Sequence, residues 1–416
     1  MKNFMYSIGK KAIIASKNKI NSKSKNKVLD QYINLIKKNK KLIIKQNSKD
    51  IKLAIKKKLR GNLIDRLTID QKKLNNICAA IKNVRKLKDP IDVTLGKWKR
   101  PNNLLIKRVS IPLGVIGVIF ESRPNVASDI SSLCFKSGNA VILKGGSEAL
   151  NSNKILVSLF RKALKANKID ANYVQLIEKK ERKYVDFMLS SMSNYIDVII
   201  PRGGRGLVAK VQKLSKVPTI GHLEGICHTY IDKEADLKMA TKVTYNAKLR
   251  NTSICGATET ILINKKVVKK FCNPILKKLE ENQCKIIGDK YLKKFYKGKL
   301  FLAKEKDWST EYLSSTVSVK CVENLKAAIN HINKYGTMHT YAIITKNKKS
   351  AKKFLKNIKS SIAIHNASTQ FADGGEFGFG GEVGISTNKI PPRGPVGLEQ
   401  LVSYKYEVIG KGQIRK

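Results

Sequence analysis

The stretch that decides the fold runs from Val115 to Ser147 and reads VIGVIFESRPNVASDISSLCFKSGNAVILKGGS. It contains two runs of Val, Ile and Leu, at Val115–Phe120 and Ala140–Leu143, and an amphipathic stretch separates them. A short run that is apolar at every position is typical of a strand buried on both faces, as in a parallel sheet. The second run continues into Lys-Gly-Gly-Ser, which predicts a turn that leads into a helix.

The same pattern continues further along the chain. Apolar runs recur at Val174–Ile177, Ile196–Ile200 and Thr229–Ile231. Helical periodicity separates such runs, as in Ser147–Ala166 and Tyr184–Ser191. The alternation predicts an α/β fold with a doubly wound parallel sheet, and such sheets bind nucleotides beyond the carboxyl ends of their strands. A second alternating region, from Ala235 to Ile364, predicts a further α/β domain.

Helices are predicted ahead of the first sheet. Between residues 24 and 88, apolar residues recur at helical spacing among many lysines, for example at Leu29, Ile33 and Ile36. Asp89-Pro90 and the Arg100–Asn103 segment then predict turns, with loop and a short strand between them. The chain has 416 residues and 42% hydrophobic content, which is enough for two or three domains.

The formal charge of +52 raises the question of nucleic-acid binding. Lysine is spread over nearly the whole chain together with Ile and Asn, without the arginine and aromatic interleaving of a base-stacking surface. We therefore predict no specific nucleic-acid partner, although weak non-specific adhesion fits this charge. The longest apolar stretch, Ile111–Phe120, is too short to cross a bilayer, and Ala12–Ala15 is shorter than a secretory signal. A cytoplasmic protein without membrane contact is predicted.

The cysteines give no sign of a disulfide framework or of a metal site. There are seven, an odd number, and none forms a Cys-x-x-Cys pair. Because free cysteine is often a small buried hydrophobe, any one of them taken alone is interpreted as part of the core. No metal is predicted.

Two glycine-rich turns carry positive charge. The first, after the second strand, presents Lys144, Gly146 and Ser147 at the start of a helix. The second follows the fourth strand and presents Arg202, Gly203 and Gly204. Glycine lets a ligand approach the backbone, and a helix N-terminus favours an anion. Each turn alone is an ordinary capped turn, but two of them at the strand ends of one sheet predict a site for the phosphates of a dinucleotide.

Four segments carry a resemblance to a known family. They are Ile111–Asn153, Asn246–Thr260, Asn366–Thr387 and Arg393–Arg415. With their ESRPN, IPRGG and RGP-GLE motifs they resemble the gamma-glutamyl phosphate reductase family, within the aldehyde dehydrogenase superfamily, over almost the entire chain. The resemblance implies N-terminal helices and an NADP-binding domain over residues 1–228, a catalytic thiol domain over 229–385, and a C-terminal segment with an oligomerisation arm over 386–416.

The resemblance also implies an activity and partners. The expected reaction is the NADPH-dependent reduction of L-glutamyl 5-phosphate to L-glutamate 5-semialdehyde with release of phosphate, the second step of proline biosynthesis. A homo-oligomer is expected, with transient contact to the glutamate kinase that makes the labile substrate. An ordinary aldehyde dehydrogenase is the alternative enzyme, and it would need a base that activates water.

The family pattern assigns the nucleophile to Cys255, in SICGATET. A thiolate displaces phosphate from an acyl phosphate and leaves a thioester, which is electrophilic enough to accept hydride. His222 aligns approximately with the glutamate base of hydrolytic relatives. It either moves a proton for the leaving group or is a structural histidine.

The remaining site residues are also implied by the resemblance. Asn125 or, in its place, Arg123 is expected to stabilise an oxyanion or hold the substrate, although both also suit a turn. Glu311 is expected to hold the nicotinamide ribose. At the position three residues after Lys144, NAD-using relatives often have a glutamate where this chain has Ser147, which favours NADPH. The loop expected to hold the glutamyl end includes Asn366, Ser368 and Thr369.

Overall fold

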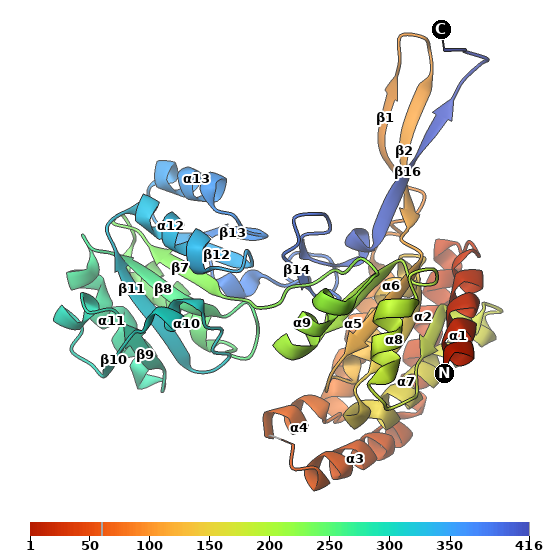
Figure 1. Cartoon of the computed structure of the whole chain (residues 1–416), viewed down its shortest axis with the longest axis horizontal. Coiled ribbons are helices and arrows are strands. Elements are labelled where there is room, and N and C mark those ends of the chain that lie inside the picture. Colours follow the sequence, from red (N-terminus) through yellow and green to blue (C-terminus); the bar gives the residue numbers. More distant parts are fainter. Residues whose placement is uncertain (60, 416) are drawn as a thin grey trace. The chain divides into compact units, whose positions relative to one another are not determined.

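The computed structural model describes residues 1–59 and 61–415, which form two compact units (Figure 1). The first comprises Met1–Gly221, Gly378–Gly384 and the chain from Val396 onward, and the second comprises His222–Phe377 and Ile385–Pro395. The sequence-based division ends its domains at residues 228 and 385. In the structure, the chain after residue 377 alternates between the two units. Gly378–Gly384 and the chain from Val396 onward both belong to the first unit, where Val396 exchanges backbone hydrogen bonds with Val383 and Gly384.

Helices precede the first sheet, as predicted. They are α1 (Lys2–Ser16), α2 (Ser22–Lys38), α3 (Lys40–Lys56), α4 (Gly61–Leu67) and α5 (Gln71–Lys86). Asn21 and Asp70 accept hydrogen bonds from first-turn amides and so begin α2 and α5. The sequence reading missed α1, which lies ahead of the stretch in which helices were predicted. No helix of the described residues is long and apolar enough to cross a membrane.

The first sheet has the order β5-β4-β3-β6, and its strands are parallel. They are β3 (Val115–Phe120), β4 (Ala140–Gly145), β5 (Val174–Leu176) and β6 (Val198–Arg202). The helices of this region are α6 (Asn125–Lys136), α7 (Leu150–Ala166), α8 (Lys183–Ser191) and α9 (Arg205–Leu214), with short helix η1 (Ser147–Ala149) before α7. The strand order reverses between β3 and β6, which in such sheets marks the place where a dinucleotide binds.

The second sheet is also parallel, in the order β10-β9-β11-β8-β7-β12-β13. Its strands are β7 (Cys227–Ile231), β8 (Thr258–Asn264), β9 (Lys285–Gly288), β10 (Leu300–Leu302), β11 (Thr316–Val322), β12 (Thr340–Ile344) and β13 (Ile362–His365). Its helices are α10 (Leu237–Leu249), α11 (Val268–Glu281), α12 (Leu325–Tyr335) and α13 (Lys348–Asn357). The predicted strand at Thr229–Ile231 is β7, which belongs to this second sheet.

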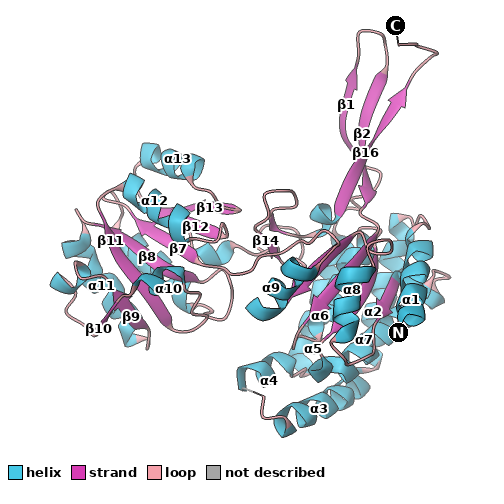
Figure 2. Cartoon of the chain, in the orientation of Figure 1, coloured by secondary structure: helices cyan, strands magenta, loops and turns pink. Residues whose placement is uncertain are grey.

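Alternate residues of the second sheet serve two separate cores. Ile231 and Ile263 pack with α10 and α11 on one face, whereas Tyr230 and Leu262 pack with α12 and α13 on the other. Because successive side chains of a strand point to opposite faces, runs that are apolar at every position allow helices to cover both (Figure 2). This arrangement confirms the predicted α/β fold.

A narrow antiparallel ribbon extends the first unit. It consists of β1 (Thr94–Lys99), β2 (Leu105–Pro112) and β16 (Val402–Ile409), in the order β1-β2-β16 (Figure 1). Its large side chains include Trp98, Tyr404 and Tyr406, all of them exposed. We refer to this ribbon as the arm. A small antiparallel pair, β14 (Ile385–Ser386) with β15 (Gly394–Pro395), lies in the second unit.

Candidate active site

Cys255 lies in the turn between α10 and β8, in the second unit. Its side chain is half-buried beside Ala372 and Ile385. Gly225 packs so closely that a Cβ atom there would meet the Cys255 carbonyl, so this position needs glycine. The thiol of Cys227 donates a hydrogen bond to the same carbonyl at 3.0 Å. The turn is therefore held from the backbone side, and its sulfur is partly accessible.

The other thiols have surroundings that favour the protonated form. Burial raises the pKa of the thiols at Cys78, Cys134, Cys227, Cys272, Cys284 and Cys321. Because the thiolate is the nucleophile, these six are poor candidates for covalent chemistry. The structure thus supplies a physical reason against these six, which the sequence alone lacks.

Two imidazoles lie beside Cys255. Its Sγ atom and one ring nitrogen from each of His222 and His339 lie within 4.8 Å of one another. The Nδ1 atom of His222 is 2.7 Å from the Ile385 carbonyl oxygen, and the two imidazole centroids are 4.8 Å apart. The His339 Nδ1 atom contacts the Thr340 hydroxyl at 2.9 Å. His222 is thus near the thiol, as its predicted role requires, but that role remains a prediction.

His339 was not found from the sequence. It is fully buried and directly precedes β12, in the segment MHTYAII. A single histidine beside an apolar strand has no spacing pattern that separates it from a core residue. Only the pairing of β12 with β7 brings its surroundings close to the Cys255 turn.

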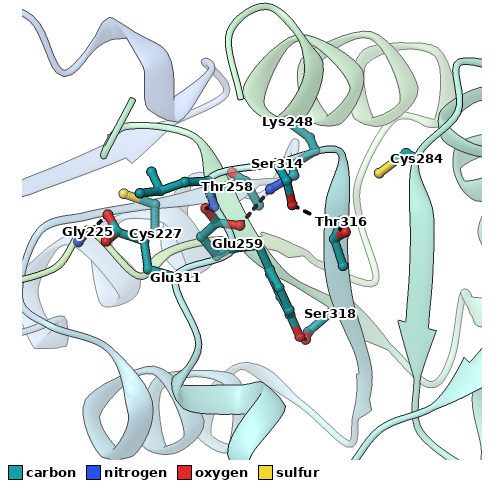
Figure 3. A network of polar contacts seen from close by, with 12 residues as sticks. Gly225, Cys227, Lys248, Thr258, Glu259, Cys284, Glu311, Ser314, Thr316 and Ser318 are labelled. Atoms are coloured by element: carbon teal, nitrogen blue, oxygen red, sulfur yellow. Dashed lines mark hydrogen bonds and ion pairs between the residues drawn. The ribbon is translucent and has the colours of Figure 1, made fainter. Parts of the chain in front are cut away.

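Glu311 reaches the same loop from another direction. Its carboxylate accepts a hydrogen bond from the Gly225 amide at 2.9 Å, as Figure 3 shows. Nearby, Glu259 and Lys248 form a fully buried ion pair at 2.5 Å. Burial raises the pKa of the Glu259 carboxyl to about 7, although Lys248 acts in the opposite direction. Glu259 also accepts the Leu313 amide, so this pair fixes the loop that carries Glu311.

The three predicted substrate residues all have structural partners. Asn366 adopts a left-handed φ of 57°, and its amide group both accepts from the Thr345 amide and donates to the Thr345 carbonyl, each at 2.9 Å. Ser368 caps a short helix (Thr369–Phe371), and Thr369 is within 3.0 Å of the Thr258 hydroxyl. Thr369 lies close to the Cys255 turn, since its carbonyl packs against Gly256. Their proposed contacts with substrate remain predictions.

Asn125 and Arg123 belong to the first unit. Asn125 is the first residue of α6, and its amide nitrogen donates to Asp129 at 2.9 Å. The Arg123 carbonyl accepts the Val126 amide and closes the turn before this helix. Burial raises the pKa of Asp129 to about 6, whereas the bond from Asn125 lowers it. The Asn125 amide therefore has a partner within its own helix, and its role as an oxyanion donor remains a prediction.

The end of β4 places a buried cation at the carboxyl edge of the first sheet. Lys144 is 4% exposed and donates to the Gly145 carbonyl at 2.9 Å. Burial lowers the pKa of Lys144, and the carboxylate of Glu148 raises it. Glu148 accepts both the amide and the hydroxyl of Ser122, at 2.7 and 2.9 Å. Glu148 is thus turned toward the loop after β3, and Ser147 begins η1.

At the turn after β6, a carboxylate of the protein also accepts a hydrogen bond from the loop. Gly204 precedes α9, and its amide donates to the Glu121 carboxylate at 3.0 Å. A Cβ atom on Gly203 would collide with that carboxylate, so the glycine makes room for it. Arg202 lies 3.8 Å from Glu382. Part of the anion-binding capacity of the α9 N-terminus is therefore already used by the chain itself.

A model of the aldehyde dehydrogenase family matches residues 10–301. Gamma-glutamyl phosphate reductase of Parvibaculum lavamentivorans is 46% identical over 373 residues, 90% of this chain and 88% of that protein. The Brucella suis enzyme of that name is 45% identical over 394 residues, 95% of this chain and 93% of the relative. The crystal structure of gamma-glutamyl phosphate reductase from Thermotoga maritima matches with a TM-score of 0.96 at 38% identity, covering 99% of this chain and 100% of that one.

These matches define first a class of protein: an oxidoreductase with an aldehyde dehydrogenase fold and a cysteine beside its second sheet. The chain belongs to the aldehyde dehydrogenase family, and within it to the gamma-glutamyl phosphate reductases. The family predicted from the sequence motifs is confirmed. Members of the wider family use nicotinamide dinucleotides.

Proposed function

We propose that this chain reduces L-glutamyl 5-phosphate to L-glutamate 5-semialdehyde with release of phosphate, using NADPH and a thioester on Cys255. The observation that carries the proposal is the partly accessible thiol of Cys255, within 4.8 Å of two imidazoles, in a chain 46% identical to a gamma-glutamyl phosphate reductase. The reaction is a reductive step of proline biosynthesis.

The Cys255 sulfur attacks the acyl carbon of the substrate. A carbon–sulfur bond forms, the carbon–oxygen bond to phosphate breaks, and phosphate leaves with the electron pair. The thiol proton has to be removed for this step. Because a carbonyl partner at Nδ1 fixes the proton of neutral His222 on that atom, Nε2 carries the lone pair that can accept the thiol proton.

Water has to be kept from the thioester. In hydrolytic relatives a glutamate base is expected at approximately the position of His222, and a carboxylate there would activate water. The His222 imidazole lies beside the Cys255 thiol, and the Ile385 carbonyl fixes its Nδ1 atom. It is therefore suited to accept the thiol proton instead of activating water. A free-aldehyde dehydrogenase is the alternative reaction, and it differs in needing no phosphate.

The cofactor would lie at the carboxyl edge of the first sheet. Lys144 near the end of β4 would hold it together with Gly146 and Ser147. At the end of β6, Arg202, Gly203 and Gly204 would hold it as well, and Glu311 would meet the nicotinamide ribose. The fit rests on Lys144, a buried ammonium with more donors than its bond to Gly145 uses. When bound, the reduced nicotinamide supplies the hydride that turns the thioester into an aldehyde. The neutral hydroxyl of Ser147 beside this cation favours NADPH.

A homo-oligomer is proposed on the basis of the arm. Its exposed aromatic residues Trp98, Tyr404 and Tyr406 form a surface that a second subunit can cover. We place the enzyme in the cytoplasm, since its cysteines are all free, as is usual in a reducing compartment. There the kinase that phosphorylates glutamate would supply the labile acyl phosphate through transient contact.

The reverse reaction tests the activity. Purified protein is mixed with glutamate 5-semialdehyde, NADP and phosphate, and NADPH formation is followed by absorbance. We expect turnover only when phosphate is present, because the thioester has to be released by phosphate. Equal turnover without phosphate would identify a hydrolytic aldehyde dehydrogenase instead.

A further inference from the structure

The side chains around Cys255 have the composition of a metal-binding site, in addition to supplying the proposed nucleophile. The Cys255 sulfur and a ring nitrogen from each of His222 and His339 lie within 4.8 Å of one another. One thiolate and two imidazoles form a ligand set that suits Zn²⁺, which binds sulfur and nitrogen tetrahedrally. Around zinc, such atoms lie about 3.5 Å apart, so the side chains would have to close by about 1 Å.

The outer contacts of both histidines are those expected of metal ligands. The His222 Nδ1 atom lies 2.7 Å from the Ile385 carbonyl oxygen, and the His339 Nδ1 atom lies 2.9 Å from the Thr340 hydroxyl. Zinc-binding histidines usually engage a carbonyl or another oxygen through the ring nitrogen that does not bind the metal. In both residues these Nδ1 contacts are compatible with metal binding through Nε2.

An independent observation comes from His339. This residue is fully buried, and within the described part of the chain its Nε2 atom has no hydrogen-bond partner. Leaving a buried polar nitrogen without a partner costs about 1–3 kcal/mol. A ligand that bonds to this nitrogen would remove the cost. Because the His339 side chain belongs to the same group of three, a ligand bound to it would be shared with Cys255.

We propose that His222, Cys255 and His339 bind Zn²⁺ reversibly, with the fourth position left to water or an anion. On binding, the Cys255 thiol loses its proton to solvent and its sulfur forms a bond to zinc. The metal would then block the nucleophile and inhibit turnover. That consequence rests on the proposed function, whereas metal binding itself rests on the geometry alone.

Cobalt gives a test that is independent of activity. Co²⁺ replaces Zn²⁺ in such sites, and its spectrum reports both tetrahedral geometry and a sulfur-to-cobalt charge-transfer band. We expect both signals in the wild-type protein, loss of the charge-transfer band in Cys255→Ser, and loss of tetrahedral binding in His339→Ala. His365→Gln is the matched control and should retain the full spectrum, since His365 is outside the group.

Alkylation gives a second measurement that stays valid if the His339 variant folds poorly. Iodoacetamide labelling of Cys255 and of Cys78, the other half-buried cysteine, is followed by peptide mass spectrometry. Zn²⁺ should protect Cys255 and leave Cys78 unchanged, and Mg²⁺ should protect neither. In His339→Gln the zinc concentration for half-protection should rise at least about tenfold. Equal protection in this variant, or wild-type cobalt spectra without a charge-transfer band, would overturn the site even if the reductase activity is verified.

Discussion

The carboxyl edge of the first sheet and the Cys255 site of the second unit use their polar groups in opposite ways. At the sheet edge, carboxylates of the chain already accept hydrogen bonds from nearby donors: Glu121 binds the Gly204 amide, and Glu148 binds Ser122 in the loop after β3. At the Cys255 site, a carbonyl oxygen contacts Nδ1 of His222 and a hydroxyl oxygen contacts Nδ1 of His339. The reactive atoms there gather within 4.8 Å.

The difference shows that a glycine-rich turn before a helix is not in itself a vacant anion site. At the α9 N-terminus, Gly203 leaves room for a carboxylate of the protein. The expectation of a phosphate site at this edge therefore depends on the cations Lys144 and Arg202 more than on the helix. At the Cys255 site, in contrast, the sequence marks the thiol only through its family resemblance, and His339 joins Cys255 only in the fold.

The sharpest test of the comparison is to remove the sulfur. Cys255→Ser should lower acyl-phosphate reduction by about a thousandfold or more, because an alcohol is a far weaker nucleophile at neutral pH. NADPH binding, measured by fluorescence titration, should be unchanged, because the predicted phosphate contacts lie on the first unit. Cys78→Ser is the control and should retain activity. Substantial turnover in Cys255→Ser would mean that the nucleophile is another group.

Much of the fold follows from local sequence pattern. The strand predicted at Val115–Phe120 has the observed bounds, and those predicted at Ala140–Leu143 and Val174–Ile177 agree with β4 and β5 within two residues. Buried parallel strands have to be apolar on both faces, so the sequence marks them clearly. The alternation of the chain between the two units at residues 378–395 has no such sequence signal, because it depends on backbone pairing between segments such as those of Val383 and Val396.

The site was less accessible to prediction. Cys255 was assigned by family resemblance, since its position beside His222 and His339 is a property of the fold. His339 carried no signal, because its nearness to Cys255 arises from strand pairing across a long sequence separation. The partner of Glu148 was also unpredicted, since a first-turn carboxylate can bind a neighbouring loop as readily as it can cap its own helix.

The two units should also differ in their response to acid. In the second unit, burial lowers the pKa of His331 to about 2 and that of His228 to about 4, from an ordinary 6.5. Unfolding then takes up protons below pH 6.5, so stability present at neutral pH is lost as pH falls. In the first unit, burial raises the pKa of Asp129 to about 6. The folded protein then binds this proton before the unfolded chain does, so the contribution of Asp129 to stability increases as pH falls. For His331 alone the loss is about 3 kcal/mol by pH 4.

Tryptophan fluorescence can isolate this effect. Trp308 packs against His331 in the second unit, and Trp98→Phe removes the other tryptophan. In that background, urea unfolding is measured between pH 7 and pH 4.5, with and without His331→Phe. We expect the substitution to reduce the acid slope by about 1.4 kcal/mol per pH unit. An unchanged slope would show that His331 is protonated in the folded protein, and Asp129→Asn is the comparison variant for the first unit.

A smaller effect is expected at the sheet edge, where cofactor choice is proposed to depend on Ser147. Ser147→Glu would place a carboxylate near the 2′-phosphate of NADPH and Lys144, while offering an acceptor to the ribose hydroxyl of NADH. The ratio of kcat/KM for NADPH over NADH should fall by about tenfold or more. Ser147→Gln, of similar size but neutral, separates charge from bulk and should shift the ratio less. If both variants leave the ratio unchanged, the 2′-phosphate is recognised elsewhere.

The smallest effect concerns Glu148, and it tests whether a carboxylate already present weakens this site. Glu148 accepts two hydrogen bonds from Ser122 and acts electrostatically on Lys144, the cation proposed to meet the 2′-phosphate. In Glu148→Gln the side-chain oxygen can still accept from Ser122, whose φ of 43° depends on local support, but the negative charge is removed. Removing the repulsion between the partly solvated Glu148 carboxylate and the 2′-phosphate should stabilise bound NADPH by about 0.2–1 kcal/mol. The KM for NADPH should therefore fall up to about fivefold. NADH lacks the 2′-phosphate, and its KM should stay nearly constant.

Because screening weakens such contacts, the gain should also shrink as salt is raised. An equal change for both cofactors, or a gain that is independent of salt, would mean that Glu148 acts only by positioning the Ser122 loop.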